Sequence, residues 1–295
     1  MNRQIISTPR GPESALVNAS AGPSAPWLHF GHASGMHAHL YTRFLTPLTS
    51  RFNIVAADFR GHGESPFPID NRPANRWQDL AEDTLALINT LAPAKQWWLM
   101  GHSLGAVCAM VAAQHHPERI TGLMLLDPPL LPAHSVPDFS PENLARAIPL
   151  VRQSLRRRPH FPDRASIEAS YKGRGVFQTF SDEDLTSYID GAFAPSSEGM
   201  HLRCTPHWEA ATFNGLMDDT SHWPGALTRP FTLLAGATES TVSDADLARY
   251  AAHPLCHQAR RLPDTDHFLP LQAGETIRLS LIALTTSTLA PAAGL

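Results

Sequence analysis

The chain contains a serine held between two glycines, in the sequence GHSLG at residues 101–105. An apolar run at residues 97–100 leads into it, and an alanine-rich stretch follows it. A G-x-S-x-G pattern at a strand-to-helix turn exposes a serine hydroxyl above a sheet. At the N-terminus of a helix, where backbone N–H groups favour negative charge, that hydroxyl can attack a carbonyl carbon. We therefore predict that Ser103 is a nucleophile.

A serine hydroxyl is a weak nucleophile at neutral pH, so it needs a general base oriented by a carboxylate. His267 lies late in the chain, and the order serine, acid, histidine is typical of hydrolases with this turn. Glu239 follows an apolar run at residues 231–235, and Asp127 ends another at residues 123–126. We predict His267 as the base, favour Glu239 as its acid and keep Asp127 as the alternative acid.

Short apolar runs alternate with longer helical patterns along the chain, which predicts an α/β fold with a doubly wound, mostly parallel sheet. Runs bounded by Gly, Pro or Asp are typical of strands covered on both faces. We predict helices over residues 77–91 and 103–116, and from about residue 275. The predicted strands are Trp27–Phe30, Ile54–Ala57, Trp97–Met100, Leu123–Leu126 and Phe231–Ala235.

Residues 128–229 interrupt this alternation with helical patterns and no convincing core strand. A connection of that length without structure of its own would be unusual in a compact protein. We predict a core domain made of residues 1–127 and 230–295, and an inserted helical domain made of residues 128–229. The insertion leaves after one strand and returns before the next, so it should lie over one edge of the sheet.

Composition narrows the functional classes. The 295 residues are 43% hydrophobic and 17% charged, with a formal charge of −4, which argues against electrostatic binding of nucleic acid. The arginines at 156–158 and Arg174 are predicted to be solvated charges, with a binding role as the alternative. Three widely spaced cysteines show no metal or disulfide pattern. No signal-like or bilayer-spanning apolar stretch is present, so we expect a cytoplasmic protein without a membrane span.

Four stretches resemble the α/β-hydrolase fold superfamily, and in particular serine hydrolases with a helical cap domain. They are HFGHASG (29–35), DFRGHGES (58–65), GHSLG (101–105) and DHFLP (266–270), in the family's order. The resemblance implies an α/β-hydrolase fold in which residues 128–229 form the cap and residues 58–65 have an architectural role. The family's usual acid after the strand at 231–235 is aspartate, whereas this chain has Glu239, which keeps Asp127 as an alternative.

The resemblance also implies an oxyanion hole. In the family, a His-Gly pair after the third strand supplies one backbone N–H, and here the corresponding pair is His32-Ala33, with alanine in place of glycine. By this likeness the N–H of Leu104 is one donor, and that of Ser34 or Ala33 is the other. Such donors stabilise the charge that develops on the carbonyl oxygen in the transition state.

We therefore expect a serine hydrolase that cleaves a carboxylic ester, thioester or lactone of a small or medium-sized acyl substrate through an acyl-enzyme on Ser103, with no cofactor. Cofactor-free haloperoxidase (perhydrolase) chemistry, carbon–carbon bond hydrolysis or non-catalytic ligand binding are the alternatives. A metal site on His32, His37 and His39 is disfavoured, because the cluster lacks the pattern of a dinuclear or zinc hydrolase. No nucleic-acid partner is expected, and the sequence leaves the oligomeric state open.

Overall fold

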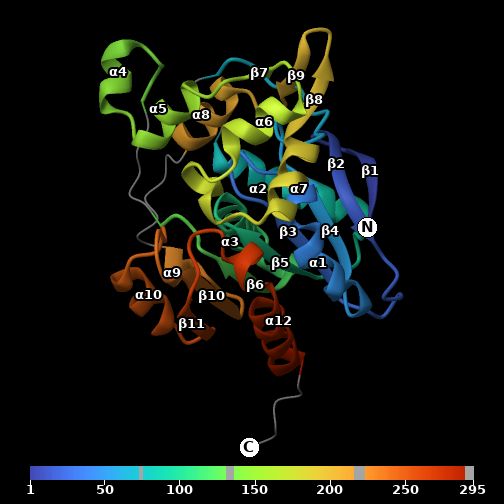
Figure 1. The fold of residues 1–295 in the computed structure, drawn as a ribbon. Coiled ribbons are helices and arrows are strands. Elements are labelled where there is room, and N and C mark those ends of the chain that lie inside the picture. The colour runs from blue at the N-terminus through green and yellow to red at the C-terminus, as the bar shows by residue number, and fades with distance from the viewer. Residues whose placement is uncertain (73–75, 131–135, 216–222, 290–295) are drawn as a thin grey trace, which may run out of the picture.

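The computed structural model describes residues 1–72, 76–130, 136–215 and 223–289. An eight-stranded sheet with the order β1-β2-β4-β3-β5-β6-β10-β11 lies at its centre (Figure 1). The pairs β1–β2 and β2–β4 are antiparallel, and the strands from β4 to β11 are parallel. The strands are β1 (Asn2–Thr8), β2 (Gly11–Asn18), β3 (Trp27–Gly31), β4 (Asn53–Asp58), β5 (Trp97–His102), β6 (Ile120–Leu126), β10 (Phe231–Gly236) and β11 (Cys256–Leu262).

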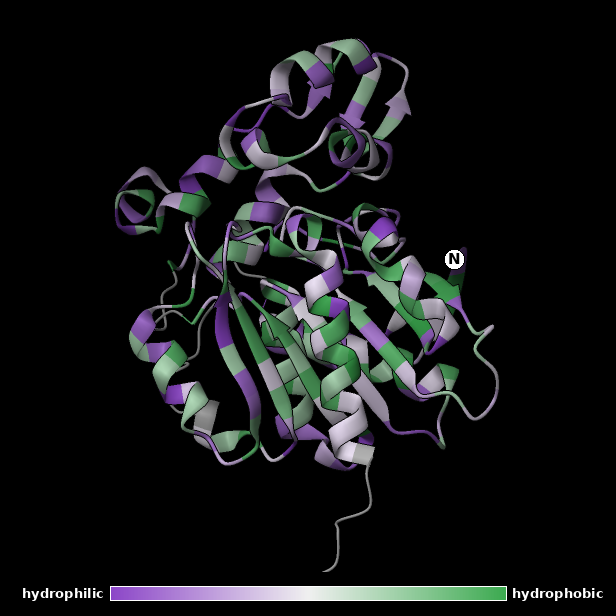
Figure 2. Cartoon of the chain, turned by 60° about the horizontal axis from the view of Figure 1, so that its bottom comes forward, coloured by the Kyte–Doolittle hydropathy of each residue, from purple (hydrophilic) through white to green (hydrophobic). Residues whose placement is uncertain are grey.

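The middle strands are mostly apolar because the sheet is covered on both faces, although a few buried polar residues such as His29 and Thr232 lie in them. Along β4, Val55 and Ala57 enter one core cluster, whereas Ile54 and Ala56 enter the other. Alternate residues of a strand point to opposite faces, so a strand buried on both sides needs no polar position. Figure 2 shows this as hydrophobic colouring concentrated on the strands in the middle of the sheet.

Helices complete the two outer layers. Buried residues of α2, α3 and α10 belong to the first core cluster, and those of η1, α1 and α12 belong to the second. The helices outside the insertion are η1 (Ala38–Tyr41), α1 (Thr42–Leu45), η2 (Thr46–Ser50), α2 (Trp77–Leu91), α3 (Leu104–His115), η3 (Pro117–Arg119), α10 (Asp244–Ala251), α11 (Leu269–Gln272) and α12 (Gly274–Leu289). In the described residues, no helix is long and apolar enough to cross a membrane.

The elements from α4 to α8 between β6 and β10 gather at one end of the molecule, drawn in green to orange in Figure 1, whereas α9 lies near β10. This inserted segment is tied to the core by Trp208, whose indole Nε1–H donates to the Arg60 carbonyl at 2.8 Å, and by Trp77, whose Nε1–H donates to the Thr212 carbonyl at 2.7 Å. Its elements are α4 (Pro141–Arg146), α5 (Pro149–Leu155), β7 (His160–Phe161), α6 (Arg164–Tyr171), η4 (Gly175–Thr179), α7 (Asp182–Ala192), β8 (Phe193–Ser196), β9 (Gly199–Leu202), α8 (Pro206–Asn214) and α9 (Trp223–Ala226).

Several segments of the chain form hydrogen bonds at the end of β4 and in the loop that follows it. This is in keeping with the architectural role that the family resemblance implies for residues 58–65. The buried Asp58 carboxylate accepts from the N–H groups of Ala38 and Glu64 and from Arg3. Burial raises the pKa of Asp58, but the Arg3 guanidinium and the hydrogen bonds to its carboxylate outweigh burial and bring the pKa below its ordinary value. The loop is therefore held by an ionised carboxylate at the last residue of β4.

The five predicted strands correspond to β3, β4, β5, β6 and β10, and the predicted α/β fold is confirmed. The prediction omitted β1, β2 and β11, which lie at or next to the sheet edges, and the small antiparallel sheet β7-β9-β8 inside the insertion. Strand β1 has one buried residue and β11 carries polar residues such as Gln258 and Arg260. Edge strands with polar surfaces lack the apolar runs by which inner strands are found.

Candidate active site

Ser103 lies at the sharp turn between β5 and α3, with φ 54° and ψ −119°. This left-handed conformation is uncommon for a residue with a side chain. The turn brings backbone segments so close together that the flanking positions have no room for a side chain. A Cβ on Gly101 would lie 2.1 Å from the Gly105 carbonyl carbon, and a Cβ on Gly105 would lie 2.1 Å from the Gly31 oxygen. The turn therefore presents the serine at the carboxyl edge of the parallel sheet.

His267 lies in the loop between β11 and α11, and its Nδ1 is 3.0 Å from Oδ2 of Asp127. Asp127 follows β6 and is fully buried. Its other carboxylate oxygen, Oδ1, accepts the hydroxyl of Ser240 at 2.6 Å, and its backbone oxygen accepts the hydroxyl of Thr241 at 3.0 Å. A carboxylate on Nδ1 holds the imidazole in the tautomer whose Nε2 can accept a proton.

Glu239, the favoured acid in the sequence, has an exposed side chain in the loop after β10. No hydrogen bond joins Glu239 to His267 in the described structure. The cause is the course of this loop, because the N–H groups of Ala237 and Thr238 both donate to the carbonyl of Thr265, at 2.9 and 3.1 Å. The structure thus brings His267 to the alternative acid, Asp127, and leaves Glu239 toward solvent at the wall of the cavity.

The histidine inside the G-x-S-x-G motif positions the candidate base. His102 Nε2 lies 2.7 Å from the backbone oxygen of His267, and Nδ1 lies 2.7 Å from the hydroxyl of Tyr41. Since a carbonyl only accepts, Nε2 carries the proton and Nδ1 accepts from Tyr41. Burial holds the pKa of His102 well below its ordinary value, so the ring is neutral at pH 7. The sequence motif alone did not reveal this role.

The loop after β3 is held by a second buried histidine, His32. Its Nε2 accepts the backbone N–H of Phe59 at 3.0 Å, so Nδ1 carries the proton and donates to the Ala33 carbonyl at 2.7 Å. Ala33 and Ser34 line the same cavity as Leu104, the first residue of α3. The first N–H groups of a helix have no carbonyl four residues earlier, so the N–H of Leu104 is free of the helix ladder.

Most of the candidate site residues from the sequence line one cavity of about 1040 Å³, whereas Asp127 contacts His267 without lining the cavity. Ser103 and His267 line it from the core, together with the loop after β3. The inserted segment contributes the opposite wall, with aromatic side chains that include Phe161, Tyr171 and Phe213. The sequence located these aromatic residues in the insertion but did not distinguish those that face the cavity.

Arg157, in the arginine run predicted to be solvated, is mostly buried, with 18% of its side chain exposed, and it lines the cavity. Its Nη1 donates to Oε2 of Glu209 at 2.5 Å, and Nη2 donates to the hydroxyls of Tyr171 and Tyr188 at 3.0 and 2.7 Å. These partners come from three different helices of the insertion, so no local pattern around residue 157 indicated them. The prediction of a solvated charge is wrong at this position.

The histidine cluster considered as a metal site has other partners. His37 Nδ1 accepts the N–H of Leu40 at 3.3 Å, and Nε2 donates to the carbonyl of Tyr188 at 2.9 Å. Nowhere in the described ranges do three or more His, Cys, Asp or Glu side chains form a group that could hold a metal ion.

A family model for the alpha/beta hydrolase fold matches residues 26–273. The chain belongs to this family and is a hydrolase of the α/β fold. The match spans every stretch on which the resemblance depended, and the predicted family is confirmed.

Two curated relatives indicate the range of activities around the chain. A 2-(acetamidomethylene)succinate hydrolase of Mesorhizobium japonicum is 25% identical over 254 residues, which cover 86% of this chain and 85% of the relative. A pimeloyl-[acyl-carrier protein] methyl ester esterase of Methylococcus capsulatus is 31% identical over 122 residues, but the matched region spans 39% of that protein.

Solved structures support the same fold. The crystal structure of E-2-(acetamidomethylene)succinate hydrolase superposes with a TM-score of 0.80, at 22% identity, over 97% of this chain and 99% of that one. The enol-lactonase of Burkholderia xenovorans LB400 superposes with a TM-score of 0.72, at 16% identity, over 96% of this chain and 100% of that one.

Proposed function

We propose that the protein is a serine hydrolase that cleaves a carboxylic ester, thioester or lactone through an acyl-enzyme on Ser103. His267 is the general base and Asp127 is the acid that orients it. Residues 128–229 act as a cap that closes the substrate cavity. The observation that carries the proposal is the pairing of His267 Nδ1 with the buried Asp127 carboxylate, in a cavity that Ser103 also lines.

In the first half-reaction, Ser103 Oγ attacks the carbonyl carbon while its proton moves to His267 Nε2. The Asp127 carboxylate stabilises the imidazolium that forms. When the tetrahedral intermediate collapses, the bond to the leaving group breaks and His267 returns the proton to that group. A water molecule then attacks the acyl-enzyme, with His267 again accepting the proton, and the acid is released from Ser103.

The oxyanion of each tetrahedral intermediate is bound by backbone N–H groups. Leu104 supplies one from the start of α3, and Ala33 or Ser34 supplies the other from the loop held by His32. Three features support this assignment: all three residues line the cavity, the Leu104 N–H begins a helix, and a helix N-terminus favours negative charge. Loss of one such donor typically lowers the rate by roughly 10²–10³.

A fluorophosphonate probe tests the nucleophile directly, because it reacts with an activated serine hydroxyl. We expect labelling of the wild type at Ser103, located by peptide mass spectrometry, together with hydrolysis of p-nitrophenyl esters. Ser103→Ala should lose both, and Ser20→Ala, which removes an exposed serine, should retain both. An unlabelled wild type, or labelling that persists in Ser103→Ala, would contradict the proposal.

A second candidate is hydrolysis of an amide on an unsaturated dicarboxylate. It is favoured by the 2-(acetamidomethylene)succinate hydrolase that matches 86% of the chain. The same nucleophile and base would act, with nitrogen in the leaving group instead of oxygen. Acetate release from 2-(acetamidomethylene)succinate, compared with turnover of simple esters by the same preparation, separates the two candidates.

A further inference from the structure

Arg157 is a fixed cation in the wall of the proposed active-site cavity. Burial lowers the pKa of its guanidinium, but Tyr188, Glu209 and Tyr171 outweigh burial and raise the pKa well above its usual value. A guanidinium carries five N–H groups, and the contacts to these three residues use three of them. Within the described residues, two N–H groups therefore remain for another acceptor, on a side chain whose position is held by its neighbours.

The charges on this wall favour an anion. Among the described residues of the insertion, Arg157, Arg158 and Arg174 line the cavity together with one carboxylate, that of Glu209, which leaves a surplus of two positive charges among these side chains. The core contributes two acids, Glu239 and Asp266. The Asp266 carboxylate accepts hydrogen bonds from the Thr179 hydroxyl at 2.6 Å and from the Phe268 N–H at 2.7 Å. The side chain of Glu239 is exposed to solvent.

The Arg157–Glu209 pair lies against the loop that carries the proposed oxyanion donors. A Cβ on Gly35 would lie 2.2 Å from Glu209 Oε1 and 3.5 Å from Arg157 Nη1. The next residue back, Ser34, is 9% exposed, and its hydroxyl has no partner among the described residues. Ser34 lines the cavity. A buried hydroxyl without a partner is costly unless a ligand or water satisfies it.

We propose that Arg157 and the Ser34 hydroxyl form a subsite for a carboxylate of the substrate, next to the carbonyl group that Ser103 attacks. The inference rests on the proposed function and narrows its substrate class to acyl compounds that carry a second, free carboxylate. A charge-assisted pair with a guanidinium and a hydroxyl donor is a common way to bind a carboxylate away from water.

Paired esters of equal chain length test the subsite. The probes are mono-p-nitrophenyl glutarate, which carries a free carboxylate, and p-nitrophenyl valerate, which does not. We expect the wild type to have the higher kcat/KM for the glutarate. In Arg157→Gln/Glu209→Gln, which removes both charges and keeps hydrogen-bonding groups in place, the glutarate-to-valerate ratio of kcat/KM should fall at least tenfold, mainly through KM.

Two further variants keep the test sharp. Ser34→Ala, a small change that the fold should tolerate, should lower the same ratio by roughly threefold to tenfold, as expected for one hydrogen bond to a charged group. Arg156→Gln, the exposed neighbour in the arginine run, should leave the ratio unchanged. A wild type that prefers valerate, or a ratio unaltered in both the double variant and Ser34→Ala, would overturn the subsite.

Binding measured without turnover separates failure of the subsite from failure of the proposed chemistry. Glutarate should bind Ser103→Ala in isothermal titration calorimetry. When Arg157→Gln and Glu209→Gln are added to this variant, the Kd for glutarate should rise at least tenfold. If neither ester is hydrolysed but glutarate binds in this way, the proposed reaction fails and the subsite stands. If the esters are hydrolysed and glutarate does not bind, the subsite fails and the reaction stands.

Discussion

At the scale of single residues, the candidate acid is decided by geometry and not by residue type. Asp127 and Glu239 both lie in loops that follow parallel strands of the sheet, and both have positive φ, 46° and 47°. Asp127 is buried, bonded to Ser240 and in contact with His267, whereas Glu239 is exposed. A carboxylate on Nδ1 both holds the base in its working tautomer and stabilises the imidazolium that forms.

The two acids can be separated with isosteric amides. We expect Asp127→Asn to lower kcat for ester hydrolysis by about 10³–10⁴, because an amide can donate to Nδ1 and so favours the wrong tautomer. Glu239→Gln should change kcat by less than about threefold, because its side chain lies in solvent and does not contact His267. Steady-state kinetics of both variants would check this, and a larger loss in Glu239→Gln would reverse the assignment.

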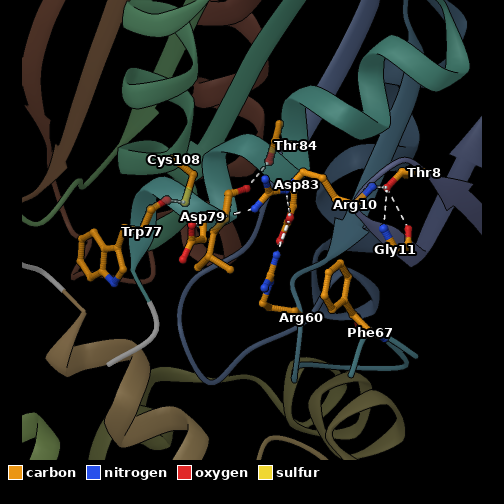
Figure 3. A network of polar contacts seen from close by, with 12 residues as sticks. Thr8, Arg10, Gly11, Arg60, Phe67, Trp77, Asp79, Asp83, Thr84 and Cys108 are labelled. Carbon is orange, nitrogen blue, oxygen red and sulfur yellow. Dashed lines mark hydrogen bonds and ion pairs between the residues drawn. The ribbon is translucent and has the colours of Figure 1, made fainter. Parts of the chain in front are cut away.

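At the scale of elements, an ion-pair network joins the loop after β4 to α2 and to the hairpin of β1 and β2 (Figure 3). Asp83 on α2 accepts from Arg60 Nη2 at 2.5 Å and from Arg10 Nε at 2.7 Å. The side chains of Arg60 and Asp83 are only 8% and 6% exposed. Arg60 also lies 4.0 Å from the centre of the Phe67 ring, so its guanidinium is held on two sides.

Removing the shared carboxylate should therefore destabilise the fold. We expect Asp83→Ala to lower the free energy of unfolding by about 3–5 kcal/mol, because the Arg60 charge would remain buried without its partner. Urea denaturation followed by circular dichroism measures the change. The control, Asp79→Ala, removes a half-exposed carboxylate 3.9 Å from Arg10 and should cost less than about 1 kcal/mol. Equal losses in the two variants would count against this view of the network.

At the scale of the whole molecule, the protein buries an unusual set of neutral histidines. Burial lowers the pKa of His29, His32 and His37 to about 4 and that of His62 to about 3, and it holds the pKa of His102 well below its ordinary value. In the unfolded chain the pKa of each histidine would be near its ordinary value of 6.5. Between about pH 6.5 and pH 4 the unfolded state therefore binds more protons than the folded state.

This linkage predicts acid-labile folding. The stability that these groups contribute is fully present above pH 6.5 and is lost as the pH falls toward 4, by up to about 1.4 kcal/mol per pH unit for each histidine. Unfolding free energies measured by chemical denaturation from pH 8 to pH 4.5 would show the slope.

A single substitution should remove the contribution of one titrating histidine from the dependence of the unfolding free energy on pH. His29 has a buried Nε2 without a partner in the described structure, so His29→Leu removes a titrating group without breaking a hydrogen bond. Its stability should fall less steeply with acid than that of the wild type. His257→Gln, at an exposed position of β11, should leave the slope unchanged. A slope that does not differ between His29→Leu and the wild type would contradict the prediction.

The sequence by itself predicted the features that depend on short-range geometry. The turn around Ser103 requires glycines where the backbones of residues 31, 101 and 105 meet, and two of these glycines belong to the five-residue motif at 101–105. The inner strands of the sheet are readable for a similar reason, because burial on both faces demands continuous apolar runs. The family and the fold class follow from these local patterns.

Only the tertiary structure decided which distant groups meet. The bonds from the loop after β10 to Thr265 expose Glu239 and leave Asp127 beside His267. Arg157 is buried because three helices of the insertion surround it, which no spacing in the sequence encodes. Contacts of this kind depend on the course of loops and on packing between elements, since both are set by the whole chain and not by neighbouring residues.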